Sequence, residues 1–138
     1  ATSPAWRGRG TVLVVEDEEA IRTFTKTVLE RLGFRILLAE NGRQAVELFQ
    51  AHAATRPAGE QDRIVFVLLD MTMPHMNGEE TFRALREVQK DLRIIITSGY
   101  SEQDIVPLFT REPHTGFLLK PYRPADLRTA LHAILNAS

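Results

Sequence analysis

The chain has 138 residues, 43% of them apolar and 25% charged, a composition that excludes a disordered chain and a fibrous repeat. The formal net charge is -1, so the basic excess that nucleic-acid binding needs is missing. No cysteine occurs, which excludes disulfides, thiolate metal sites and a cysteine nucleophile. We expect one cytoplasmic domain with no direct contact to nucleic acid. We also expect no direct contact to membrane, because no apolar run is long enough to span a bilayer.

The first ten residues, 1–10, mix Pro, Gly, Ser and Arg without periodicity, so we expect a linker or disordered arm. After them, short apolar runs alternate with amphipathic stretches, which indicates βαβ units in a single domain over residues 11–136. The first, third and fourth runs are apolar nearly throughout, as is typical of central strands covered on both faces. The predicted strands are 11–15, 35–39, 64–69, 93–97 and 116–119.

Apolar residues recur at helical spacing between these strands, so we expect amphipathic helices that turn these residues toward the sheet. They are Ile21, Phe24, Val28 and Leu32; Ala45, Leu48 and Phe49; Phe82 and Leu85; and Leu127, Leu131 and Ile134. Gly33 is expected to close the first helix, and Asn41-Gly42 to make a turn before the second. Pro124 suits the first turn of the last helix.

Two segments fit this pattern less well. Residues 52–63 form a long connection, which we expect to be an exposed, mobile insertion. Pro107 falls within 101–109, where it would remove a helical hydrogen bond. The fourth helix is therefore expected to be short, kinked or displaced.

Reactive side chains follow or end the predicted strands, and the carboxyl ends of parallel strands converge on one crevice. Carboxylates at about 4 Å repel by about 4 kcal/mol at an effective dielectric of 20, so their cluster calls for a hard divalent cation. Oxygen ligands suit Mg²⁺, with Mn²⁺ as a substitute. An oxygen of Asp70 could then attack phosphorus, which predicts an aspartyl phosphate. The residues are Glu16 and Asp17, Asp70, Thr97 and Ser98, and Lys120.

Four motifs, in this order and spacing, resemble the receiver domain of two-component response regulators. The resemblance covers 11–136 and implies a flavodoxin-like, doubly wound α/β fold whose five parallel strands have the order 2-1-3-4-5. It also implies a cis Lys120-Pro121 bond. The motifs are VLVVEDEE (12–19), LLDMTMPHMNGEE (68–80), IIITSGYSE (94–102) and FLLKPY (117–122).

The resemblance assigns a role to each site residue. Asp70 is the phosphoacceptor, while Ser98 and Lys120 hold phosphoryl oxygens. Mg²⁺ is bound by Asp17 directly, by Glu16 through water, by Asp70, and by the backbone carbonyl of Thr72. Ser98 and Phe117 form the switch, and variation at Thr72, Gly99 and Tyr100 tunes the lifetime of the phosphorylated state.

The implied donor is a phosphohistidine on a histidine kinase or histidine phosphotransfer domain, and the receiver itself catalyses its phosphorylation and dephosphorylation. The space vacated by the Ser98 hydroxyl would admit Phe117 and change the face made by the fourth helix, fifth strand and fifth helix. That face is the expected output surface and the expected contact of any homodimer.

The SGYSE run and the PAWRGRG lead-in look most like receivers fused to the carboxyl end of hybrid sensor histidine kinases. We expect no DNA-binding output domain, because only two residues of this sequence follow Asn136. We therefore expect a receiver from a hybrid kinase, whose sensor part could be membrane-bound, with a free-standing receiver as the alternative.

Other interpretations stay open. The acidic run at Glu16 could simply complement a helix dipole, and Asp70, Ser98-Gly99 and Lys120-Pro121 could be ordinary turn residues. A Mg²⁺-dependent phosphohydrolase with an Asp nucleophile is a second function, although such enzymes normally carry an Asp where Thr72 stands. A docking module that never becomes phosphorylated is a third.

Overall fold

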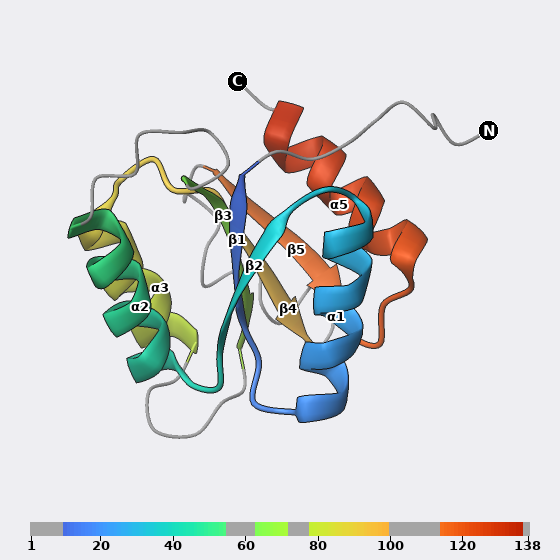
Figure 1. Ribbon diagram of the computed structural model, residues 1–138, viewed down its shortest axis with the longest axis horizontal. Helices are drawn as coiled ribbons and strands as arrows, with labels where there is room; N and C mark the ends of the chain where they lie inside the picture. Colours follow the sequence, from blue (N-terminus) through green and yellow to red (C-terminus); the bar gives the residue numbers. More distant parts are fainter. Residues whose placement is uncertain (1–9, 55–62, 72–77, 100–113, 137–138) are drawn as a thin grey trace.

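The computed structural model describes residues 10–54, 63–71, 78–99 and 114–136, in which a five-stranded sheet has helices on both faces (Figure 1). The strand order is β2-β1-β3-β4-β5, and every pairing is parallel. This confirms the flavodoxin-like, doubly wound α/β fold. The strands are β1 (Thr11–Val15), β2 (Arg35–Ala39), β3 (Ile64–Asp70), β4 (Ile94–Ser98) and β5 (Thr115–Leu119), and the helices are α1 (Glu19–Arg31), α2 (Gly42–Ala54), α3 (Gly78–Val88) and α5 (Pro124–Asn136).

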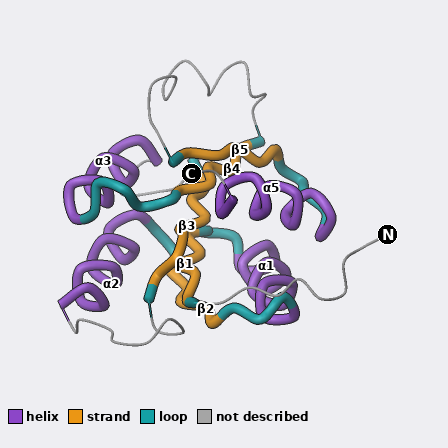
Figure 2. The backbone as a smooth tube through the Cα atoms, turned by 90° about the horizontal axis from the view of Figure 1, so that it is seen from above, coloured by secondary structure: helices purple, strands orange, loops and turns teal. Residues whose placement is uncertain are grey.

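The sheet separates two apolar layers, because alternate side chains of a strand point to opposite faces. Leu13 and Val15 of β1 pack with α2 and α3, whereas Val12 and Val14 pack on the side of α1 and α5 (Figure 2). All four side chains are buried. Burying each one contributes about 1.5–3 kcal/mol, which explains why the central strands are apolar without alternation.

Helix α1 differs from its prediction at Phe24. This side chain is 38% exposed, and the buried residues of the helix are Thr25 and Leu29. One residue turns a helix by about 100°, so with Thr25 against the sheet Phe24 points to the rim. Its ring lies 6.2 Å from that of Tyr122. Two predicted helix ends are confirmed. Gly33, just after α1, has a positive φ of 107°, and α5 begins at Pro124.

Several boundaries also moved. Residues 52–54 continue α2, so they do not belong to the predicted insertion, and Asn41 caps α2 by accepting a hydrogen bond from the Gln44 amide at 2.9 Å. Asp70 is the last residue of β3 instead of following it, and Ser98 ends β4, as expected. Residues 1–9 of the predicted arm (1–10), residues 55–62 of the predicted insertion (52–63) and the segment 101–109 with Pro107 lie outside the described residues.

The start of α3 closely approaches the end of β3. The Gly78 amide donates to the Met71 carbonyl at 3.3 Å, and a Cβ at position 78 would lie 2.6 Å from the Met71 Cα. Only glycine fits this contact, so it holds the backbone directly after Asp70 against α3. Within the described ranges, no helix is both long and apolar enough to cross a membrane.

Candidate functional site

Three carboxylates meet at the carboxyl edge of the sheet, from the β1–α1 turn and the end of β3. One oxygen each of Glu16, Asp17 and Asp70 lies within 4.8 Å of the others. Asp17 is exposed, while Glu16 and Asp70 are only 3% and 2% exposed. Clustered carboxylate oxygens are the donor set that a hard divalent cation prefers, so these residues fit Mg²⁺.

Lys120 reaches the same carboxylates from the end of β5. Its Nζ lies 2.9 Å from Glu16 Oε1 and 3.3 Å from Asp70 Oδ2. Its backbone amide donates to the Ser98 carbonyl at 2.8 Å, which ties the lysine to the end of β4. The lysine thus neutralises part of the buried negative charge and lies beside an Asp70 oxygen.

The pKa values record this crowding. Burial raises the pKa of Glu16 from 4.5 to about 7, the negative charge of Asp70 adds to the rise, and the hydrogen bond from Lys120 opposes it. Burial alone would lower the pKa of Lys120, but the hydrogen bond to Glu16 and the charge of Asp70 outweigh it and raise the pKa. One ammonium does not offset three carboxylates, and a divalent cation is the complementary charge.

A cavity of about 600 Å³ opens onto these groups, with Asp17, Asp70, Gly99 and Lys120 in its wall. Among the described residues, a Cβ at Gly99 would meet no atom within 4 Å, so none of them closes the cavity at this point. A second, largely apolar pocket of about 280 Å³ lies beside it and includes Phe24 and Tyr122. The two share Ile21, Lys120 and Pro121, so they form one continuous surface.

The structure brings most of the predicted site residues together. Ser98 is buried at the end of β4, one residue beyond the Thr97 that pairs with Asp70. Phe117 of β5 is half-buried and packs against the apolar layer that contains Ile96, its partner on β4. The Lys120-Pro121 bond is cis, as predicted. Thr72 and Tyr100 lie outside the described residues.

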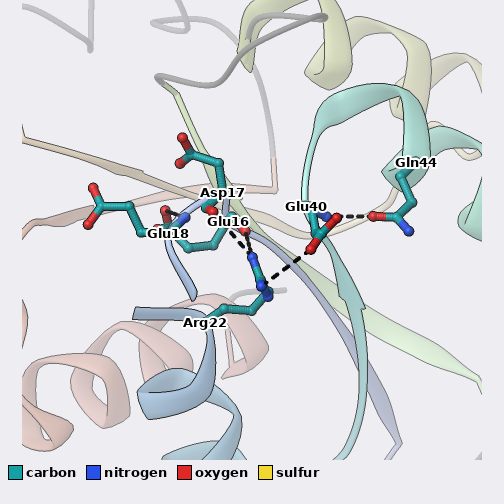
Figure 3. A network of polar contacts seen from close by, with 6 residues as sticks. All are labelled: Glu16, Asp17, Glu18, Arg22, Glu40 and Gln44. Atoms are coloured by element: carbon teal, nitrogen blue, oxygen red, sulfur yellow. Dashed lines mark hydrogen bonds and ion pairs between the residues drawn. The ribbon is translucent and has the colours of Figure 1, made fainter. Parts of the chain in front are cut away.

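Sequence reasoning missed two polar contacts around the site. Arg22 of α1 donates to the backbone carbonyls of Glu16 and Asp17 (Figure 3). Thr25 Oγ1 hydrogen-bonds the Tyr122 hydroxyl, which joins α1 to the segment after Lys120. The available signals were an arginine one turn after Glu18 and a threonine within an apolar face.

Fold and site together define the class, a receiver-type domain with an acidic pocket at the carboxyl edge of its sheet. The sequence pattern of the response regulator receiver domain matches residues 12–132, and the chain belongs to this family. Receiver domains bind Mg²⁺ through acidic residues and interact with histidine kinases or phosphotransfer partners. Membership therefore confirms the predicted family of two-component signalling domains.

Individual relatives agree with this assignment. The sensor kinase CckA of Brucella abortus (strain 2308) is 33% identical over 129 residues, which cover 94% of this chain but 13% of the kinase. The transcriptional regulatory protein CpxR of Escherichia coli (strain K12) is 32% identical over 127 residues, 92% of this chain and 50% of that protein. The chain thus spans half or less of these two relatives.

One solved structure of a response regulator is similar over nearly the whole chain. The response regulator protein TrrA from Thermotoga maritima, in complex with Mg²⁺ and BeF, has a TM-score of 0.73 and 27% identity, covering 91% of this chain and 98% of that chain. The similarity spans nearly the full length of both chains, so it concerns the whole receiver fold.

Proposed function

We propose that this domain, residues 11–136, accepts a phosphoryl group on Asp70 from a phosphohistidine of a histidine kinase or histidine phosphotransfer domain. The observation that carries the proposal is the buried Asp70 carboxylate, which lies 3.3 Å from Lys120 Nζ and clusters with Glu16 and Asp17 beside an open cavity. Nucleophile, countercharge and donor access thus coincide at one place.

The residues divide the chemistry among them. An Asp70 oxygen attacks phosphorus, the P–N bond to the donor imidazole breaks, and the imidazole nitrogen keeps the electron pair and takes up a proton. Lys120 pairs with one phosphoryl oxygen and Ser98 donates a hydrogen bond to another. Glu16, Asp17, Asp70 and the Thr72 carbonyl hold Mg²⁺, or Mn²⁺ in its place. Bound Mg²⁺ supplies positive charge that stabilises the phosphoryl oxygens in the transition state.

The conformational response to phosphorylation of Asp70 follows from the position of Ser98, which lies next to β5. When Ser98 and Lys120 turn toward the phosphoryl group, the space beside Ser98 admits the half-buried Phe117. The surface of β5 and α5, together with the fourth helix, then changes and acts as the output face, or as the contact of a homodimer. Thr72, Gly99 and Tyr100 tune how long the phosphoryl group persists.

The apolar pocket beside the cavity offers the donor domain a place to bind. A phosphohistidine must reach Asp70 through the cavity, and the pocket formed with Phe24 and Tyr122 shares three lining residues with it. A domain that presents its histidine here can bury apolar side chains against Phe24 at the same time. Similarity to the CckA sensor kinase supports an origin in a hybrid sensor histidine kinase in the cytoplasm, with a free-standing receiver as the alternative.

The test is phosphorylation by acetyl phosphate with Mg²⁺, followed by intact mass measurement. Wild type should gain one base-labile phosphoryl adduct, and Asp70→Asn should gain none because the nucleophilic oxygen is gone. Asp91→Asn, an exposed aspartate beyond α3, is the matched control and should react like wild type. Rapid multiple turnover of a phosphate ester would instead indicate a phosphohydrolase. No adduct from acetyl phosphate or any cognate kinase would indicate a docking module.

A further inference from the structure

Arg22 of α1 contacts the acidic turn through backbone atoms only. Its Nη1 donates to the Glu16 carbonyl at 2.8 Å and to the Asp17 carbonyl at 3.3 Å. The guanidinium therefore lies on the carbonyl side of Glu16 and Asp17, two of the three residues whose carboxylates form the acidic cluster (Figure 3). The Arg22 side chain is 13% exposed, and its bond to the Glu16 carbonyl is partly buried, whereas its bond to the Asp17 carbonyl is exposed.

A second contact fixes the guanidinium from the other side. Arg22 Nη2 lies 3.5 Å from Glu40 Oε1, just after β2. The Glu40 amide donates to Gln44 Oε1 at 2.6 Å, which fastens Glu40 to the first turn of α2. Arg22 thus connects the acidic turn to the β2–α2 connection, and its fork has little freedom to rotate.

The Glu16 carboxylate is held by other donors. Its Oε2 accepts the Glu18 amide at 3.2 Å, and its Oε1 faces Lys120 at 2.9 Å. The carbonyl side of this turn is held by Arg22 and the carboxylate side by Glu18 and Lys120. The orientation of the Glu16 and Asp17 side chains therefore depends on where Arg22 holds their backbone.

We infer that Arg22 is a positioning residue for the divalent-cation site, acting through the Glu16 and Asp17 carbonyls rather than through its charge. This inference rests on the proposed function. The two actions have opposite signs: a positive charge beside the carboxylates repels Mg²⁺, whereas an ordered turn favours Mg²⁺ by holding its ligands in place. Loss of Arg22 therefore weakens Mg²⁺ binding only if positioning dominates.

The experiment measures Mg²⁺ dissociation constants by calorimetry for wild type, Arg22→Gln, Arg22→Lys and Arg31→Gln. Arg22→Gln removes the charge and the fork, and should weaken Mg²⁺ binding about tenfold. Arg22→Lys keeps the charge and one donor, and should weaken binding less. Arg31→Gln removes the same charge from the exposed last residue of α1 and should leave the constant unchanged.

A kinetic readout separates positioning from general damage to the fold. In Arg22→Gln, the Mg²⁺ concentration giving half-maximal phosphorylation by acetyl phosphate should rise about tenfold, while the rate at saturating Mg²⁺ stays at the wild-type value. Equal or tighter Mg²⁺ binding by Arg22→Gln, equal weakening by Arg31→Gln, or a lowered saturating rate would overturn the inference. Arg22→Lys gives the same test if the glutamine variant fails to fold. Wild type that binds no Mg²⁺ would overturn the proposed function itself, and the inference with it.

Discussion

The two edges of the sheet differ in the charged groups that they bury. At the amino edge, arginines donate to backbone carbonyls: Arg86 to those of Lys90 and His114, both at 3.1 Å, and Arg93 to that of Ile134 at 3.1 Å. At the carboxyl edge, Glu16 and Asp70 are buried together and outnumber the one ammonium between them. Arg22 also donates to backbone carbonyls at the carboxyl edge. What distinguishes that edge is its pair of buried carboxylates, which repel each other and are available to a cation.

This contrast teaches that stability and chemistry are separated along the strands. Hydrogen bonds from a charged group are worth about 1.5–3 kcal/mol each, so the amino edge contributes stability. Burying like charges costs stability, so the carboxylates at the carboxyl edge do not serve the fold, and such groups are typical of functional sites. Four substitutions, taken from the largest expected effect to the smallest, test that separation.

Lys120→Ala should have the largest effect on stability, because it leaves the buried Glu16 and Asp70 carboxylates without their cation. Breaking a buried pair costs about 3–5 kcal/mol, and urea unfolding at pH 7.5 measures the loss. Lys90→Ala, an exposed lysine after α3, is the control and should change little. The aspartyl adduct should still form on Lys120→Ala, while the amide exchange of β5 and α5 should no longer respond to it. Wild-type stability of Lys120→Ala would contradict this view of the carboxyl edge.

Arg86→Ala tests the amino edge. The variant loses the bonds to the two carbonyls and a 3.0 Å bond to Thr115 Oγ1, so we expect a loss of about 2–3 kcal/mol in unfolding free energy. Arg83→Ala is the control. The guanidinium groups of Arg83 and Arg86 both lie over the Phe82 ring, but Arg83 is exposed. The yield of phosphoryl adduct should match wild type in both variants. A lowered yield with unchanged stability would reverse the roles of the two edges.

The pH dependence of the unfolding free energy should reveal the raised pKa of Glu16. Its pKa is about 7 in the folded state against an ordinary value of 4.5, so the folded state holds this proton more tightly than the unfolded state. The contribution of Glu16 to stability is therefore favourable at low pH and is lost as pH rises from 4.5 through 7. Glu16→Gln removes this dependence. The difference in Tm between variant and wild type should shift in favour of the variant between pH 5 and pH 8, and a constant difference would refute the raised pKa.

Phe24→Ala should have the smallest effect. It should slow only phosphoryl transfer from a protein donor. The side chain is 38% exposed, so stability should fall by less than about 1 kcal/mol. Phosphorylation by acetyl phosphate should be unchanged, while transfer from a phosphorylated histidine domain should slow severalfold because the apolar pocket is lost. Val88→Ala, 37% exposed on α3, is the matched control. Equal slowing with both donors would place Phe24 in the chemistry instead of the docking surface.

Much of this architecture could be predicted from the chain because its signals are local. The apolar runs of β1, β3 and β4 predicted central strands, and the rule that parallel strands converge brought Glu16, Asp70 and Lys120 together before any coordinates. The strand order itself came from the resemblance to receiver domains.

The contacts that escaped prediction depend on how side chains fold back across elements. Arg22 lies six residues after Glu16 in sequence, and only the geometry of the β1–α1 turn brings its guanidinium to that carbonyl. Phe24 was misplaced because a periodic stripe does not say whether Thr25 or its neighbour faces the sheet. The raised pKa of Glu16 arises from burial, which sequence alone does not measure.

The position of Gly99 in the cavity wall offers a way to control the domain chemically. The chain contains no cysteine, and a Cβ added at position 99 would meet no atom of the described residues within 4 Å. A Gly99→Cys variant would hold the sole thiol of the protein, at the wall of the cavity that contains Asp70. A bulky thiol reagent attached there would obstruct the donor's route to Asp70, and a reducing agent that cleaves the attachment would reopen it.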